Sequence, residues 1–158
     1  RAVSGRAAPL LMRAAPIFAV AGLFLGLRTP ASGSAAALFI ISIFAGLLLA
    51  ASLVALMTIS LLWTISGDGI HRLSGPLIFF FSGIVIPLPL LPDWLQQWIA
   101  ILPFRGLLDT PFRVYMGVLT GSNAVAALLH QCAWVVALVL LGRVILARGL
   151  RRLIVQGG

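Results

Sequence analysis

The side chains that could carry out chemistry are few and scattered along this 158-residue chain. The sequence contains no lysine and no glutamate, and its acidic groups are Asp68, Asp93 and Asp109. A Walker A loop needs a lysine that reaches the nucleotide phosphates, so this chain cannot form one. Two histidines, one cysteine and three separated aspartates suggest neither a metal cluster nor a paired-carboxylate site. The sequence therefore predicts no catalytic, metal-binding or cofactor-binding residues and no enzymatic activity.

The composition excludes an ordinary soluble domain. The chain is 61% apolar and 9% charged, whereas soluble domains carry about 25% charged residues. A formal charge of +8 would suggest nucleic acid as a partner. The arginines, however, lie at the ends of apolar runs and form no basic stripe for a nucleic acid to bind. We therefore expect an all-α integral membrane protein whose partner is the lipid bilayer, with no nucleic acid.

Four apolar stretches are long enough to cross a bilayer, which takes about 20 residues for about 30 Å of hydrocarbon. We place the spans at about 10–27, 35–65, 75–91 and 124–147. The second is longer than a perpendicular span requires, so we expect it to be tilted. Small residues recur every fourth position in the first two spans, which predicts close helix packing. They are Gly22 and Gly26 in the first span and Ser42, Gly46 and Ala50 in the second.

Prolines interrupt the apolar segment that follows the third span, so it cannot continue as one helix. These prolines are Pro87, Pro89, Pro92 and Pro103. We expect two short interfacial helices there, at about 93–102 and 104–117. Together they would form a re-entrant pair before the last span. Irregular backbone at membrane depth is tolerated only inside protein or beside a cavity, so this pair should face a partner or a pathway.

Each short helix has a recognisable set of side chains. Asp93 suits the N-cap of the first, and its two tryptophans, Trp94 and Trp98, match the aromatic belt at lipid headgroups. In the second, three charged residues are spaced four apart and can pair along one side. These are Arg105, Asp109 and Arg113.

The arginines predict the orientation, because cytoplasmic loops near span ends retain positive charge. Eight of the eleven arginines fall on one side of the four predicted spans, and three fall on the other. The eight are Arg1, Arg6, Arg13, Arg72, Arg143, Arg148, Arg151 and Arg152. Both termini of this chain are therefore expected in the cytoplasm, with 29–34 and 88–121 outside.

The order of short motifs in the second half resembles the signature of ABC-2 type permeases. The motifs are FSGIVIPL at 81–88, LPDWLQ at 91–96, LPF at 102–104, Pro111 and Gly117. The chain ends with GR at 142–143 and RGLRRLIVQGG at 148–158. This ending resembles a subgroup of ABC-2 permeases that includes proposed viologen exporters. The resemblance covers nearly the whole chain.

The resemblance implies a membrane-spanning exporter subunit in a bacterial inner membrane. Family members usually have six spans, and this chain resembles spans three to six, so we expect a truncated single transmembrane domain over 1–158. The resemblance implies a dimer with a second permease subunit, and ABC ATPase subunits that bind ATP and drive alternating access. It also implies that the extracellular re-entrant helices seal the outer end of the pathway. The candidate gate residues are Pro87, Pro92, Asp93, Trp94, Trp98 and Pro103.

Two further groups of polar residues have two interpretations each. Asp68, His71 and Arg72 lie in the predicted cytoplasmic loop between the second and third spans. They could contact the ATPase or simply form a solvated loop. His130 and Gln131 lie about two turns inside the last span. They could line the pathway, or they could have a structural role, either in an interhelical hydrogen bond or by reaching the membrane interface.

Two other functions are compatible with the apolar pattern. Half of a secondary transporter would need a coupling-ion site of carboxylates or exposed backbone carbonyls near the membrane midplane. No predicted span core contains an acid, which argues against proton coupling by carboxylates but leaves sodium bound by backbone carbonyls open. A non-transporting membrane scaffold would share every hydropathy feature.

Overall fold

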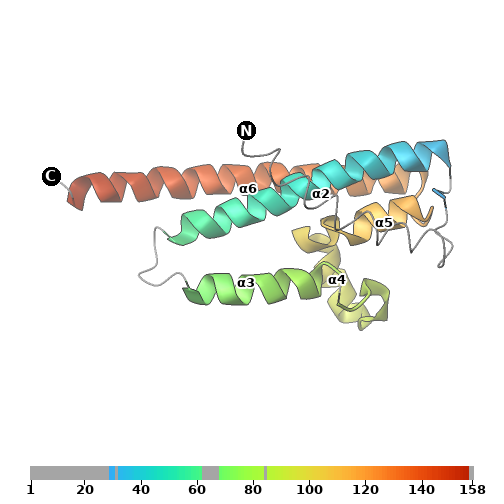
Figure 1. The fold of residues 1–158 in the computed structure, drawn as a ribbon, viewed down its shortest axis with the longest axis horizontal. Coiled ribbons are helices and arrows are strands. Elements are labelled where there is room, and N and C mark those ends of the chain that lie inside the picture. Colours follow the sequence, from blue (N-terminus) through green and yellow to red (C-terminus); the bar gives the residue numbers. More distant parts are fainter. Residues whose placement is uncertain (1–28, 31, 62–67, 84, 157–158) are drawn as a thin grey trace, which may run out of the picture.

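The computed structural model describes residues 29–30, 32–61, 68–83 and 85–156. In this part of the chain every regular element is a helix, as expected from the sequence (Figure 1). The α-helices are α2 (Gly33–Ser60), α3 (Asp68–Phe81), α4 (Asp93–Ile101), α5 (Asp109–Tyr115) and α6 (Gly121–Gln156), and the 3-10 helices are η2 (Leu88–Leu90) and η3 (Pro103–Gly106). The predicted span at 10–27, with Gly22 and Gly26, lies outside the described residues.

Two long helices, α2 and α6, lie side by side and run in the same direction (Figure 1). They contain 28 and 36 residues. At about 1.5 Å per residue they are about 42 and 54 Å long, which exceeds the hydrocarbon thickness of about 30 Å. Both are long and apolar enough to cross a membrane, α6 over Gly121–Gly149. We call the end at which both helices begin the starting end, and the opposite end the far end.

Apart from Ser42, whose partner is on α6, the polar side chains of α2 are satisfied within the helix or at its cap. Ser32 caps the N-terminus, since its hydroxyl accepts a hydrogen bond from the Ala35 backbone N–H at 3.1 Å. Further along, the Ser52 and Thr58 hydroxyls donate to carbonyls one turn back at 2.8 and 2.9 Å. These groups therefore need no water, which suits a helix without a single charged residue.

The third predicted span differs from the observed helix. We expected an apolar span over 75–91, but α3 begins at Asp68 and ends at Phe81 after 14 residues, or about 21 Å. Gly83 has a φ of 85°, a left-handed conformation that terminates helices and suits glycine. The chain then continues irregularly into η2, because prolines follow. In direction, α3 runs opposite to α2 and α6 (Figure 1).

The second predicted interfacial helix is also divided. We expected one helix over 104–117, but the structure has η3 and then α5, separated by Leu107 and Leu108. The first, expected at 93–102, corresponds closely to α4.

Two small apolar cores hold the elements together. One joins α2 and α6, and its buried residues are Leu49, Leu53 and Leu138. The other joins η2 and α4 beneath the end of α3, and its buried residues are Leu88, Leu91 and Ile99. Outside them, many large apolar side chains of α2 and α6 are exposed, among them Phe44, Leu47, Val136 and Leu140. Such surfaces suit contact with lipid or with another subunit.

Candidate functional site

Most of the polar side chains that contact one another across elements lie at the starting end. There α5 packs beside α2 and α6, and η3 packs against Gly46 and Leu49 near the middle of α2 and against Gln131 in the first half of α6. Three groups of interactions occur here: one around Gln131, one around the Ile101 carbonyl, and one around Asp109.

Gln131 joins three elements by hydrogen bonds. Its Nε2 donates to the Ser42 carbonyl oxygen at 3.1 Å and to the Gly106 carbonyl oxygen at 2.6 Å. The Ser42 hydroxyl donates back to Gln131 Oε1 at 3.0 Å. Both side chains are fully buried, so each bond forms without competition from water. Gln131 therefore fixes α6 against α2 and against the irregular backbone of η3.

Gly46 allows η3 to approach α2 directly. A Cβ atom at this position would lie 3.0 Å from the Leu107 carbonyl oxygen and 3.2 Å from that of Gly106. Both obstacles are backbone atoms, which cannot rotate away as a side chain can. The small residues Ser42 and Gly46 were predicted to lie in a helix contact, and both are buried in one.

Side chains of α6 bind the backbone carbonyl of Ile101, the last residue of α4. Trp134 Nε1 donates to the Ile101 carbonyl oxygen at 2.9 Å, and His130 Nε2 lies 3.0 Å from the same oxygen. His130 Nε2 is also 3.1 Å from Trp134 Nε1, so one tautomer donates to Ile101 and the other accepts from Trp134. Carbonyls in the last turn of a helix have no partner within it. These two side chains supply one.

Arg105 and Arg113 share one carboxylate. Arg105 Nε lies 3.0 Å from Asp109 Oδ2, and an Arg113 terminal nitrogen lies 3.6 Å from the same oxygen. The predicted pairing is thus confirmed, although Arg105 belongs to η3 and the other two residues belong to α5. Two positive charges meet one negative charge, so the cluster keeps one excess positive charge.

A cavity of about 300 Å³ opens beside this cluster. Four side chains that can form hydrogen bonds line it, together with small alanines of α6. The four are Arg105, Thr110, Asn123 and His130.

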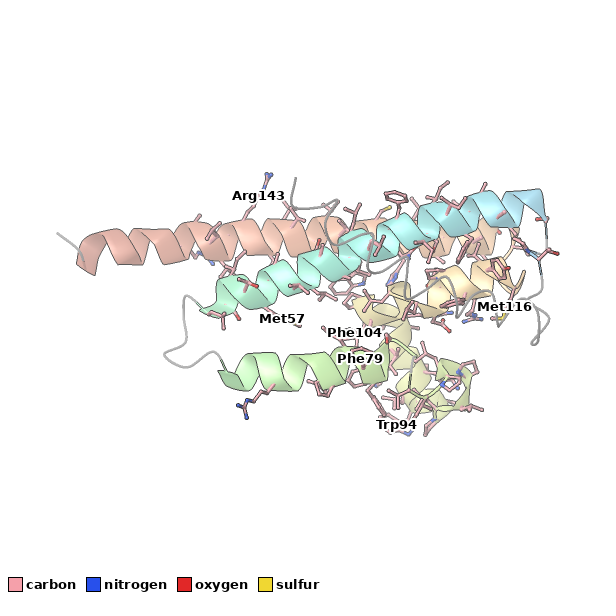
Figure 2. The ribbon with its side chains drawn as sticks, viewed as in Figure 1. Met57, Phe79, Trp94, Phe104, Met116 and Arg143 are labelled. Carbon is pink, nitrogen blue, oxygen red and sulfur yellow. The ribbon has the colours of Figure 1, made fainter. Side chains whose placement is uncertain are left out.

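The candidate gate residues do not gather at one place. Pro103 is buried at the start of η3, near the Gln131 contacts, whereas Pro87, Pro92 and Asp93 are exposed. Trp94 and Trp98 are 65% and 66% exposed, and Trp94 lies on the side of α4 away from α2 and α6 (Figure 2).

The candidate ATPase contacts lie at the other end of the molecule. Asp68, His71 and Arg72 belong to the first turns of α3, which begins near the far end of α2 (Figure 1). Arg72 is exposed, and the side chains of Asp68 and His71 lie outside the described part.

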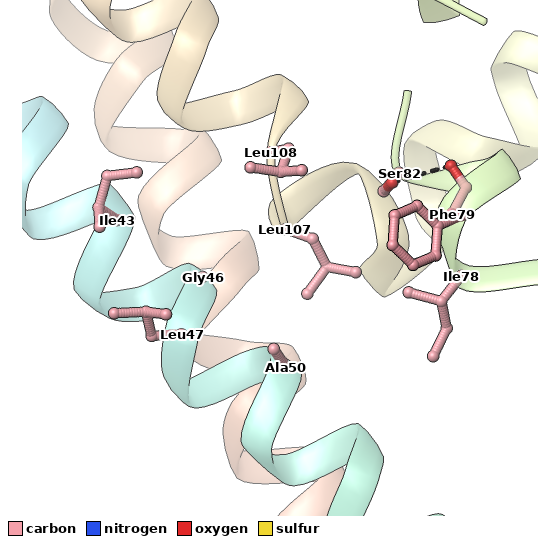
Figure 3. A pocket seen from close by; sticks show the side chains of 9 residues that line it. All are labelled: Ile43, Gly46, Leu47, Ala50, Ile78, Phe79, Ser82, Leu107 and Leu108. Carbon is pink, nitrogen blue, oxygen red and sulfur yellow. Dashed lines mark hydrogen bonds between the residues drawn. The ribbon is translucent and has the colours of Figure 1, made fainter. Parts of the chain in front are cut away.

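An apolar cleft of about 260 Å³ separates α3 from α2 (Figure 3). Its walls are formed by Ile43, Gly46, Leu47, Ala50, Ile78, Phe79, Ser82, Leu107 and Leu108. Ser82 is the polar side chain among them, and its hydroxyl donates to the Phe79 carbonyl at 3.0 Å. The cleft therefore offers almost purely apolar surface.

Several residues of the site were not predicted as such. Ser42 was recognised for its size, not for its hydroxyl, and neither Thr110 nor Asn123 was predicted to line a cavity. The partner of Ser42 lies far away in the sequence, since 89 residues separate it from Gln131.

The family model described as ABC-2 family transporter protein matches residues 14–157. No curated protein and no solved structure matched the chain. The match covers nearly the whole sequence, including both long helices and all the polar contacts of the starting end. The chain therefore belongs to the ABC-2 transporter family and is a membrane permease component of an ABC transporter.

Proposed function

We propose that the chain is the membrane-spanning subunit of an exporter that forms the substrate pathway and depends on a separate ATPase. The observation that carries this proposal is the family match over 14–157. The lack of lysine agrees with it, because a Walker A site needs that residue and these 158 residues therefore do not contain one.

We propose four spans with a re-entrant pair before the last one. Support comes from the common direction of α2 and α6. If both helices begin on the same side of the membrane, the chain must cross back once between the end of α2 and the start of α6. The segment from α3 to η2 is the apolar candidate for that crossing. The two short pieces, α4 and η3–α5, would then enter from the outer side as the re-entrant pair. The segment at 10–27 would be the remaining span.

The arginines support cytoplasmic termini in a bacterial inner membrane. Arg143 and Arg148 lie in the second half of α6 and Arg72 in the first half of α3, toward the far end. At the starting end, Arg105 and Arg113 are partly neutralised by Asp109. Under the positive-inside rule the far end faces the cytoplasm.

The gate and pathway assignments follow from this orientation. The segment containing Pro87, Pro92, Asp93, Trp94, Trp98 and Pro103 would close the outer end, and a second permease subunit would complete the pathway. Since Gln131 is engaged within this chain, we expect its contribution to the pathway to be structural. His130 lines a cavity and is the stronger pathway candidate of the two.

Accessibility of engineered cysteines tests the topology. In a Cys132→Ser background, a cysteine replacing the exposed Gln97 should react with a membrane-impermeant maleimide in intact cells. A cysteine replacing the exposed Arg148 should react only after the inner membrane is permeabilised. Labelling of both positions from the same side would contradict the proposed threading.

Co-purification with an ATPase tests the partner. The natural full-length permease should retain an ABC ATPase encoded beside it, and ATP hydrolysis by that complex should drive substrate out of cells. Replacing Arg72 by alanine should weaken retention of the ATPase, whereas replacing the exposed Arg143 by alanine should weaken it less. A permease that transports with no ATPase bound would contradict the proposal.

A further inference from the structure

We propose that the cavity beside Arg105 binds a singly charged oxyanion, either a phosphate diester or a carboxylate. The cavity holds about 300 Å³, which is room for a lipid headgroup or a small organic acid, since a water molecule occupies about 30 Å³.

The charge of the site favours an anion. Arg105 and Arg113 face the single carboxylate of Asp109, and their side chains are only 27% and 29% exposed. An excess positive charge that is largely removed from water is costly unless a counter-charge accompanies it. Asp93, the other carboxylate described at this end, lines neither this cavity nor the smaller one that Arg105 and Arg113 share. One negative charge would therefore balance the cluster.

The donors of the site are suited to oxygen atoms. Arg105 uses its Nε on Asp109, which leaves its terminal nitrogens without a partner among the described residues. A guanidinium group binds phosphate and carboxylate oxygens in pairs. The Thr110 hydroxyl and the Asn123 amide line the same cavity and can donate to the same ligand.

One wall of the cavity has small side chains and leaves space for the ligand. It is formed by the first turns of α6, where Ala126 and Ala127 present methyl groups between Asn123 and His130. A larger residue at these positions would occupy the cavity without changing any charge.

Thermal unfolding of the delipidated chain in dodecyl maltoside tests the proposal with four probes. Dioctanoyl phosphatidylglycerol carries a phosphate diester on short acyl chains, and dioctanoylglycerol has the same chains without phosphate. Dimethyl phosphate and acetate are soluble anions without chains. We expect phosphatidylglycerol to raise the unfolding temperature and dioctanoylglycerol to leave it unchanged. A response to the soluble anions as well identifies the site as a general oxyanion site, and a response to phosphatidylglycerol alone identifies it as a lipid headgroup site.

Variants connect the response to this cavity. Arg105→Gln should weaken binding by about tenfold or more, because a hydrogen bond to a charged group contributes on that order. Ala127→Leu should weaken it while leaving all charges in place, so the test does not depend on Arg105→Gln folding. The exposed control Arg143→Gln should bind like the original chain.

Substitution of Asp109 should change anion affinity in the opposite direction to substitution of Arg105. Asp109→Asn removes the internal counter-charge, so anion binding should become tighter even though the unliganded protein becomes less stable. Equal shifts with dioctanoylglycerol and phosphatidylglycerol, or unchanged binding in both Arg105→Gln and Ala127→Leu, would overturn the proposal. Since no transport is measured, its failure would leave the exporter assignment untouched.

Discussion

The two ends of the α2–α6 pair are packed in different ways. At the starting end a glycine lies against backbone, and buried hydrogen bonds join Ser42, Gln131 and Gly106. At the far end a Cβ atom added to Gly142 would lie 3.5 Å from a flexible side-chain atom of Ile59, an ordinary van der Waals distance. A mostly apolar cavity of about 200 Å³ lies beside this contact.

The difference follows from the backbone that each end must accommodate. The starting end receives η3 and the end of α4, whose carbonyls lack helical partners and need donors in a membrane. Gln131 and Trp134 are those donors, joined by His130 in the tautomer that carries its proton on Nε2. The far end joins two regular helices that already satisfy their own backbones, so it can pack loosely. We therefore expect the starting end to be rigid and the far end to adjust more easily.

Placing leucine at the two interface glycines should reveal this contrast most strongly. Gly46→Leu should lower the free energy of unfolding by about 3 kcal/mol, the upper range for overpacking, because the new side chain meets carbonyl oxygens. Gly142→Leu should cost less than about 1 kcal/mol, since the neighbouring cavity can receive the side chain. Reversible unfolding in mixed SDS and dodecyl maltoside micelles, followed by circular dichroism, measures both. Equal losses would show that the two ends are packed alike.

Removing the central amide should have the next largest effect. Gln131→Leu loses three interhelical hydrogen bonds, and at about 0.6 kcal/mol for each bond in a membrane it should destabilise the chain by about 2 kcal/mol. The exposed Gln97, changed to leucine in the same way, should cause no loss. The same unfolding assay applies, and an unaffected Gln131→Leu protein would mean that the buried bonds add nothing to stability.

The smallest expected effect concerns the carbonyl of Ile101. Trp134→Phe keeps an aromatic ring but removes the donor, so a loss of about 0.6 kcal/mol is expected. Faster hydrogen exchange in α4 should accompany it. Trp98→Phe is the matched control, because Trp98 is exposed and makes no such bond among the described residues. Equal rates of hydrogen exchange in α4 of both variants would show that the hydrogen bond from Trp134 to the Ile101 carbonyl does not stabilise α4.

The long helices could be predicted from the sequence because their signal is local and continuous. The expected spans at 35–65 and 124–147 correspond to α2 and α6 within a few residues at their starts. The beginning of α3 could not be predicted in this way. Its first turns contain Asp68 and Arg72, which hydropathy excludes from a span although they are compatible with a helix.

Only the contacts of the site that are local in the sequence could be predicted. The pairing of Arg105, Asp109 and Arg113 depends on a spacing of four residues, so it was visible in the sequence and is confirmed. The break between η3 and α5 was missed, although Pro111 lies in the first turn of α5. A proline has no backbone N–H and its ring clashes with the carbonyl four residues earlier, so one helix could not run through 104–117. The bond between Ser42 and Gln131 depends on how two distant helices align in register.

The common direction of α2 and α6 has an electrical consequence. Peptide dipoles in a helix add up to about half a positive charge at the N-terminus and half a negative charge at the C-terminus. Antiparallel neighbours would cancel, but these two helices add, and the shorter α3 offsets only part of the sum. A transmembrane voltage, at about 2.3 kcal/mol per unit charge per 100 mV, therefore acts on both helices in the same sense.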